Sequence, residues 1–490
     1  MLYKTPGVFI EEISKFPPSV AQVETAIPAF IGYTEKASKD TDGDLLRVPT
    51  RIKSLLDYET LFGGPLAEEV SVLVGTDNAV ASVDIPNPSL FRMYYALRMF
   101  FDNGGGPCYI VSIGDYTSDT SVQADVLAAM GTGTSPTGGI SLIKKVDEVT
   151  LFVFPDAQIL EGTNYHSLYQ AALSQCATLG DRFTLIDLRQ TDPAFSFPTT
   201  AIDFFRNSIG TNNLKYGAAY WPWLKTPISY HYDNESVSFS QPDGGDGNPG
   251  PFDALTLATV ETITATDTAS LNADEQTVKS NFTNEAGKDL AATIATFTIE
   301  MAPAASIAGV YAAVDSSRGV WKAPANVSLN GVIGPTEKLD DQDQADLNVH
   351  STGKSVNAIR SFTGKGTLVW GARTLAGNDN EWRYVPVRRF YNMVEESVKK
   401  ASSSFVFEPN DANTWVKVRA MIENFLLLQW RAGALQGAKP EQAFFVKVGL
   451  GETMTPQDIL EGRMIVEIGM AVVRPAEFII LRFSHKMQEA

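Results

Sequence analysis

The sequence predicts a multidomain α/β protein: a mostly parallel sheet alternating with helices, an outer β-rich insertion, and an α+β C-terminal domain. Three observations support this. Apolar runs typical of buried strands alternate with helical patterns between about residues 26 and 229. The chain has 490 residues, enough for about three domains of roughly 150 residues each. Its composition, with 44% hydrophobic and 20% charged residues, is that of a globular protein.

The alternation can be followed along the chain. The segment FRMYYALRMFFDNGGG has a helical pattern closed by glycine, and residues 165 to 179 carry one apolar stripe that includes Cys176. A further helix is expected around TAIDFFRNSI. The expected strands are CYIVSI (108–113), LFVF (151–154), FTLIDL (183–188) and YGAAYWPWL (216–224). Strands separated by helices indicate a parallel sheet covered on both faces.

An acidic segment interrupts this pattern between residues 230 and 300. It holds twelve Asp and Glu against two Lys, so its net charge is 2 − 12 = −10. It opens with PDGGDGNPGP (242–251), a cluster of turn formers, and continues as a Thr/Ala/Asp-rich stretch that we interpret as short strands. A solvated outer face explains the charge, and a cation or partner site is the alternative.

The C-terminal part predicts two helices. The first runs from about Val387 to Ala401, and the second follows FEPND, with Asn410 or Asp411 as its N-cap, and ends near Gly433. One face of the second helix is apolar and carries Trp415, Val418, Ile422, Phe425 and Leu426.

Both ends of the chain carry extended apolar runs. Near the N-terminus this run includes Val8, Phe9 and Ile10; near the C-terminus it includes Phe478, Ile479, Ile480 and Leu481. Such strands invite edge pairing unless something covers them. Strand exchange between neighbouring copies, which builds a polymer, would satisfy them.

Signals for chemistry are weaker. Asp156 and Asp187 follow two expected parallel strands, where a metal for hydrolysis could bind. No Ser/Thr or Lys signature accompanies them, so we favour Asp156 as a cap of the next helix and Asp187 as the start of a turn. Residues 353–355, Gly-Lys-Ser, match the end of the phosphate-binding loop motif G-x-x-x-x-G-K-S. The first glycine of that motif, however, would fall on Asn348. The four histidines lack zinc-ligand spacing. We therefore expect no enzyme, metal or cofactor.

The net charge and the cysteine content narrow the possible classes of protein further. The formal charge is −18 and the pI about 4.7, which disfavours a nucleic-acid binder. No apolar run reaches the roughly 18 residues of a membrane span, and the first residues lack a signal-peptide pattern. Cys108 and Cys176 are the two cysteines, expected to be reduced core thiols. We expect assembly in the cytoplasm without membrane insertion.

Many separated motifs resemble the sheath proteins of contractile phage tails and phage-tail-like injection systems. They occur in the family's order at both ends and in the C-terminal third, whereas residues 230 to 300 offer no such motif and look like a variable outer insertion. The motifs are TPGVFIEE, PPSVAQVETAIPAFIGYT, DNGGGPCYIV, RGVWKAPAN (318–326), GTLVWGARTL, EWRYVPVRRF, FEPND, GALQG (433–437), AFFVKVG and RPAEFIILRF.

The resemblance implies a particle component rather than a catalyst. Family sheaths form six-start helical arrays of hexameric rings around an inner tube, between baseplate and terminator proteins, and contract to drive the tube through a target membrane. The implied division is an N-terminal arm (1–25), an α/β sheath domain (26–229, continued in 301–355), the insertion (230–300), an inner C-terminal domain (356–476) and a C-terminal arm (477–490). A tube or baseplate component is an alternative, and a hydrolase using Asp156 and Asp187 is another.

The resemblance also implies a contact between the C-terminal domain and the inner tube. The helix from about Ala412 to Arg431 is the candidate, with Lys417 and Arg431 on the face away from Trp415 and Arg419 beside it. Lys399 and Lys400, at the end of the preceding helix, form a second candidate pair. Complementing the helix dipole would explain that pair equally well.

Overall fold

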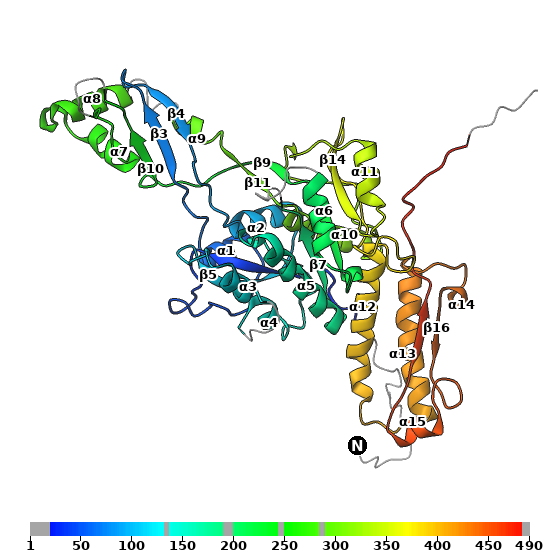
Figure 1. Cartoon of the computed structure of the whole chain (residues 1–490). Coiled ribbons are helices and arrows are strands. Elements are labelled where there is room, and N and C mark those ends of the chain that lie inside the picture. The colour runs from blue at the N-terminus through cyan, green and yellow to red at the C-terminus, as the bar shows by residue number, and fades with distance from the viewer. Residues whose placement is uncertain (1–19, 132–136, 190–198, 244–248, 284–289, 483–490) are drawn as a thin grey trace, which may run out of the picture. The chain divides into compact units, whose positions relative to one another are not determined.

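The computed structural model describes residues 20–131, 137–189, 199–243, 249–283 and 290–482 (Figure 1). The chain divides into two compact units. We call the unit Glu24–Arg389 the body, and the unit of Phe390–Ala490 with the residues up to Val23 the C-terminal unit. Val8, Phe9 and Ile10 lie outside the described residues.

A nine-stranded sheet runs through the described part of the body, in the order β12-β15-β14-β8-β7-β6-β1-β5-β2. The strands from β14 to β5 are parallel, and the antiparallel pairs lie at the two edges. Their bounds are β1 Pro28–Thr34, β2 Thr50–Ile52, β5 Cys108–Asp115, β6 Leu151–Val153, β7 Phe183–Asp187, β8 Gly217–Trp221, β12 Val327–Ser328, β14 Val356–Phe362 and β15 Gly366–Val369.

Helices cover both faces of this sheet, as Figure 1 shows. On one face α2 (Met93–Asp102) packs against α10 (Ala304–Arg318), and on the other lie α3 (Gln123–Met130), α4 (Gly139–Ile143) and α5 (Gly162–Leu179). Successive strand residues point to opposite faces: Phe30 and Leu185 belong to the first core, Ile31 and Ile186 to the second. Three layers with two apolar cores result.

The predicted alternation is confirmed element by element. The strands expected from the four apolar runs are β5, β6, β7 and β8, and the expected helices are α2, α5 and α6 (Thr199–Ser208). Cys108 and Cys176 are both free and buried. The body also contains α1 (Leu55–Phe62), α11 (Asp341–Asn348) and a small sheet of β11 (Thr298–Met301), β9 (Leu224–Ser229) and β13 (Gly334–Pro335).

The expectation of a β-rich insertion is wrong. The described residues between 257 and 294 form α7 (Leu257–Ala265), α8 (Ala273–Asn281) and α9 (Leu290–Ile294), and the side chains of Thr256 and Asn272 cap α7 and α8. Their apolar residues pack on a sheet in the order β10-β3-β4 (Val237–Ser240, Val70–Val74, Val80–Asp84). This acidic module is therefore built from two chain segments, 70–84 and 237–294.

Buried polar groups hold the base of the acidic module. The Glu68 carboxylate is 3% exposed and accepts hydrogen bonds from the backbone N and Oγ of Ser89, at 2.8 and 2.7 Å. Arg92 lies 3.9 Å from Glu68 and stacks over the Tyr230 ring. The backbone N of Glu68 also donates to the His231 carbonyl at 2.8 Å. These contacts, which we call the Glu68–Arg92 clamp, join the two chain segments of the module where each begins.

The C-terminal unit contains two long helices and a small sheet. α12 (Val385–Ser402) begins in the body and continues into this unit, and α13 (Ala412–Arg431) follows with Asp411 as its N-cap. Then come α14 (Pro440–Ala443), β16 (Phe444–Lys447), α15 (Pro456–Leu460) and β17 (Glu467–Met470). The compact units divide after Arg389 rather than at residue 355, because β14 and β15 belong to the body's sheet. No helix among the described residues could cross a membrane.

Candidate functional site

Asp156, at the end of β6, holds two other elements by hydrogen bonds. Its buried carboxylate accepts from the backbone N of Tyr33 at 2.7 Å and of Arg92 at 2.6 Å. Arg92 is the N-cap of α2. Burial raises the pKa of Asp156 to about 6, opposed by these hydrogen bonds. Asp156 occupies the N-cap position of the next helix, Ala157–Ile159, but its side chain makes no capping hydrogen bond there. The carboxylate stabilises the start of the distant α2 instead.

Asp187, at the end of β7, has a matching role. Its carboxylate accepts from the backbone N of Ala304, the first residue of α10, at 2.7 Å. Burial raises its pKa to about 7. The cavity beside it, which Trp223 and Met301 also line, measures about 10 Å³, room for one water at most. Neither a substrate nor a hydrated metal fits there.

Neither carboxylate belongs to a metal site in the described residues, where no three potential ligands gather. The phosphate-loop fragment is also engaged in the fold: Lys354 donates to the Arg206 carbonyl, and Ser355 Oγ donates to the Asn348 carbonyl at 2.6 Å. These polar groups stabilise the body, and the geometry gives the hydrolase alternative no support.

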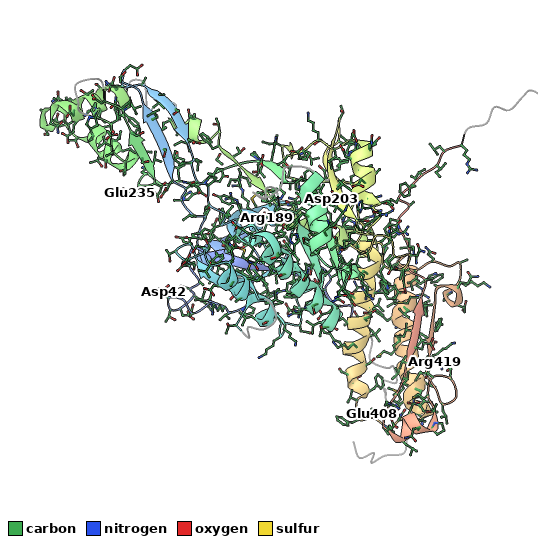
Figure 2. The ribbon with its side chains drawn as sticks, in the orientation of Figure 1. Asp42, Arg189, Asp203, Glu235, Glu408 and Arg419 are labelled. Atoms are coloured by element: carbon green, nitrogen blue, oxygen red, sulfur yellow. The ribbon has the colours of Figure 1, made fainter. Side chains whose placement is uncertain are left out.

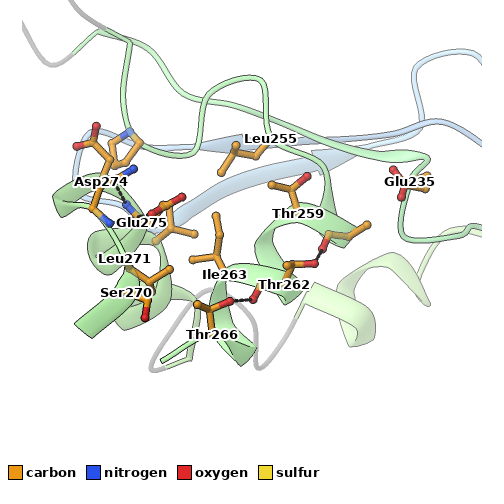
Figure 3. Close-up of a pocket in the computed structure, with 14 residues that line it drawn as sticks. Glu235, Leu255, Thr259, Thr262, Ile263, Thr266, Ser270, Leu271, Asp274 and Glu275 are labelled. Carbon is orange, nitrogen blue, oxygen red and sulfur yellow. Dashed lines mark hydrogen bonds between the residues drawn. The ribbon is translucent and has the colours of Figure 1, made fainter. Parts of the chain in front are cut away.

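The acidic module has a surface cavity of about 670 Å³ (Figure 3). Leu255, Ile263 and Leu271 form its apolar part, and Thr262 and Thr266 lie along α7. Both threonine hydroxyls donate to carbonyls one turn earlier, at 2.8 Å. These two hydroxyls therefore serve α7 itself, and nothing in the cavity's geometry points to catalysis.

The basic residues expected to contact a tube differ in their surroundings. Arg419, labelled in Figure 2, donates to Glu452 and to the Val448 carbonyl, both at 2.8 Å. Lys399 and Lys400 pair with Glu396, at 3.1 and 3.5 Å. These three cations are engaged within their own unit.

Lys417 and Arg431 are exposed and form no ion pair with any residue that the structure describes. The predicted apolar face of α13 is confirmed, since Val418, Ile422 and Phe425 are buried. The two charges lie on one side of that helix, clear of its packed face. The contact with a tube stays a prediction.

The C-terminal run is exposed, as an unpaired strand would be. Phe478, Ile479, Ile480 and Leu481 are extended, with between 69% and 78% of each side chain exposed. In the described part of the chain, β16 and β17 pair only with each other, so each has an open edge. The exchange of strands between copies stays a prediction as well.

Arg389 fixes the chain where the N-terminal segment enters the body, which sequence reasoning did not anticipate. Its guanidinium contacts the Asp315 carboxylate at 2.5 and 3.0 Å and donates to the Thr25 carbonyl at 2.8 Å. Arg389 and Asp315 side chains are 3% and 7% exposed. The EWRYVPVRRF motif contains this arginine but does not reveal its partner.

Two exposed features could not be predicted from the sequence, although each lies in a motif noted above. Phe407, in FEPND, is fully exposed. RGVWKAPAN borders a hollow of about 390 Å³ at the end of α10. The motifs alone show neither exposure nor shape.

Family models match the chain over much of its second half. The phage tail sheath protein central domain matches residues 256–375, and the phage tail sheath C-terminal domain matches 377–486. The central-domain match begins inside the acidic segment, where the sequence offered no motif. The tail sheath protein of Burkholderia phage BcepMu is 30% identical over 137 residues, 27% of this chain and 28% of that relative. The curated match thus spans little more than a quarter of the relative's length.

Solved structures match nearly the whole chain. The anti-feeding prophage helical sheath in its contracted state is 31% identical, with a TM-score of 0.63, covering 99% of this chain and 100% of that one. The sheath complex of the extracellular contractile injection system PVC, also contracted, is 30% identical, with a TM-score of 0.62 and 99% of each chain covered. The chain therefore belongs to the contractile tail sheath family.

Proposed function

We propose that this chain is the structural subunit that polymerises helically around an inner tube and contracts to drive that tube through a target membrane. One observation carries the proposal: the likeness to a contracted helical sheath extends over 99% of the chain. The assembly would consist of hexameric rings in a six-start helix, with a baseplate and a terminator at its ends. It would form in the cytoplasm as part of a phage tail or a related particle.

The mechanism requires surfaces rather than an active site. An extended sheath that buries less surface than the contracted one is metastable, and the difference drives contraction. About 1 kcal/mol per protomer, a small part of ordinary domain stability, would amount to hundreds of kcal/mol over hundreds of copies.

Strand exchange would keep neighbouring copies linked during that change. The arms, residues 1–25 and 477–490, would add strands to the C-terminal domain of adjacent copies through Val8, Phe9 and Ile10 and through Phe478 to Leu481. The open edges of β16 and β17 and the exposed C-terminal run support this proposal.

Electron microscopy of the purified full chain tests the function. Striated tubes or cogwheel-shaped rings would support the sheath, and smooth thin tubes would indicate a tube protein instead. Discrete particles that never polymerise, alone or with the tube protein, would contradict both.

Truncation tests the arms. Removing residues 1–14, or everything from Glu477, should leave folded protomers that form no long sheaths, because the backbone hydrogen bonds between copies are lost while both cores of the body stay intact. Circular dichroism checks the folding. Full-length sheaths from either truncated chain would overturn the strand-exchange proposal.

A further inference from the structure

Phe407 lies in the loop between α12 and α13 and is both exposed and strained. Its relative exposure is 103%, and its φ of +72° places a bulky residue in the left-handed region. Val406 before it is 62% exposed, and Glu408 after it is exposed too. Figure 2 labels Glu408 at this end of the two helices. Strain of this kind gathers at functional positions.

The loop is held in this conformation by its neighbours. The backbone N of Glu408 donates to the Phe405 carbonyl at 3.1 Å, and Asn410 Nδ2 donates to the Arg463 carbonyl at 3.0 Å. Trp415 Nε1 in turn donates to Asn410 Oδ1 at 2.7 Å. These bonds fix the segment on both sides of Phe407, so the ring is presented in a defined position.

The hollow at the end of α10 has the apolar lining and positive charge that would complement an aromatic ring followed by an acid. It measures about 390 Å³, between the last turn of α10 and the loop that leads to β12, and we call it the α10 hollow. Small and apolar side chains line it, with two cations and no acid among the lining residues: Ala313, Val314, Ser317, Arg318, Lys322, Ala323, Ala325, Asn326 and Val327.

The two cations of the α10 hollow have no carboxylate between them. Burial lowers the pKa of Lys322, and the nearby Arg318 lowers it further. The closest acid along α10, Asp315, is already bound to Arg389. An anion that entered the hollow would therefore be favoured by both cations.

We propose that Phe407 of one copy inserts into the α10 hollow of a second copy, where Glu408 pairs with Arg318 and Lys322. The alanine-lined space accommodates an aromatic ring, and the charges are opposite. An exposed aromatic that fills a pocket is typical of interface anchors. Because the two surfaces differ, the contact is heterologous and continues from copy to copy. The inference rests on the proposed function, since it needs a polymer.

Cysteine cross-linking between two differently marked chains tests the contact. One chain carries Val406→Cys, at an exposed position next to Phe407 that leaves the ring in place, and the other carries Ala325→Cys. The two chains are mixed, assembled and oxidised. The native Cys108 and Cys176 are buried with raised pKa values, so they do not interfere. Covalent dimers are expected from the mixture and not from either chain alone.

A matched control pairs Val406→Cys with Leu56→Cys, an exposed position in α1, and no dimer is expected. Tubes without cross-links in the first mixture would overturn the contact and leave the proposed function intact. A wild-type chain that forms no tubes would overturn the proposed function and the contact with it. Cross-linking of Val406→Cys to a cysteine of the tube protein, rather than to the second copy, would assign the loop to another partner and refute this one.

Charge reversal tests the pairing separately. Glu408→Lys and Arg318→Glu should each reduce sedimenting polymer at least tenfold, and the double variant should recover most of it. Phe407→Asn tolerates the left-handed backbone but removes the ring, so it should lose polymer while its melting temperature stays equal or rises. Leu56→Asn serves as its control. No recovery in the charge-reversed pair, or normal polymer from Phe407→Asn, would refute the contact.

Discussion

The body and the C-terminal unit differ in how they place buried charged side chains and exposed apolar side chains. The body buries charged side chains and satisfies them internally: Arg389 binds Asp315, Arg206 binds Asp346, and each guanidinium is almost fully covered. The C-terminal unit, although shorter, exposes more large apolar side chains than the body among the described residues, including Phe407, Leu460 and Phe478. In one region buried polar groups hold elements together, and in the other many apolar side chains are exposed on the protomer.

This difference concerns two separate free energies, that of unfolding and that of association between copies. Removing one partner of a buried ion pair destabilises the fold, because the other charge remains buried. Removing an exposed apolar side chain costs the protomer nothing of that kind, but it removes area that association would bury. Changes at the buried ion pairs of the body should therefore act on unfolding, and changes at the exposed apolar residues of the C-terminal unit on assembly.

The largest expected effect on folding is that of Arg389→Ala. It leaves the Asp315 carboxylate buried without its cation and frees the Thr25 carbonyl, so the free energy of unfolding should fall by about 3–5 kcal/mol. Urea unfolding of the purified protomer measures it. The control is Asp341→Asn, which removes a surface ion pair with Arg360 in which the Asp341 side chain is 98% exposed, and should change little. Equal effects of the two variants would contradict the comparison.

A smaller, pH-dependent effect is expected at Asp187. Its folded pKa of about 7 exceeds the ordinary value of 3.8, so between these values the folded state holds a proton that the unfolded chain releases. Stability from this group is therefore present below pH 3.8 and is lost as pH rises through 7. Asp187→Asn does not ionise, and its oxygen can still accept from Ala304. Relative to wild type, this variant should gain stability as pH rises from about 4 to about 7 and level off above.

Asp411, the N-cap of α13 in the C-terminal unit, supplies a control of opposite sign. Hydrogen bonding to the backbone N of Thr414 is the first cause of its lowered pKa. The stability that its charge contributes is present above the ordinary pKa and is lost as pH falls through the lower, folded value. Unfolding of Asp187→Asn and Asp411→Asn at matched pH values gives both slopes. A difference from wild type that is the same at every pH would count against either assignment.

The local sequence pattern was sufficient to predict those helices and strands whose buried apolar residues recur at a regular spacing. The stripe of α5 and the apolar runs of β5 to β8 are examples, because each element's period shows in its own residues. The helices α7 and α8 were missed, because threonines and alanines blur their apolar faces. Their caps, Thr256 and Asn272, are the local signal that could have identified them.

Long-range contacts could not be predicted in the same way. β3 pairs with β10, although the two strands are far apart in sequence. Asp156 caps α2 from 64 residues away, and Arg389 reaches Thr25 across 364 residues. A sequence shows that a carboxylate follows a strand but not which helix begins beside it. For the candidate assembly surfaces, the motifs indicated which segments are involved. Only the structure distinguished Arg419, which is bound to Glu452, from Lys417, which is exposed and forms no ion pair with a described residue.

Tube retention, rather than stability, should respond to charge reversal on α13. Lys417→Glu with Arg431→Glu should leave the melting temperature unchanged, because both side chains are exposed. It should yield empty, contracted-type sheaths, since a repeated, modest charge contact with the tube is lost. The matched control is Lys144→Glu with Lys145→Glu, the same charge change at two exposed lysines of the body, which should keep filled sheaths. Extended, tube-filled sheaths from the first variant would refute the assignment.

The smallest effect is expected from removing the acidic module, provided that both of its segments are removed. Deleting Tyr232 to Glu300 alone would strip the cover from Val70, Val72 and Val74, which lie in the module's core. It would also take Ile299 from the core of the body. Exposing that much apolar surface favours aggregation. We expect this single deletion to give insoluble protein.

The two-segment deletion avoids both problems. Ser71 pairs with Asp84, and the backbone N of Tyr230 donates to the Phe297 carbonyl at 3.2 Å. The chain can therefore be closed by short Gly/Ser bridges in place of residues 70–84 and 233–295, with the Glu68–Arg92 clamp and β11 retained. This variant should be soluble and form sheaths of normal length in electron micrographs, since the module has its own core and the body keeps its own. If it stays folded and monomeric while the wild type polymerises, the acidic module carries an assembly contact of its own.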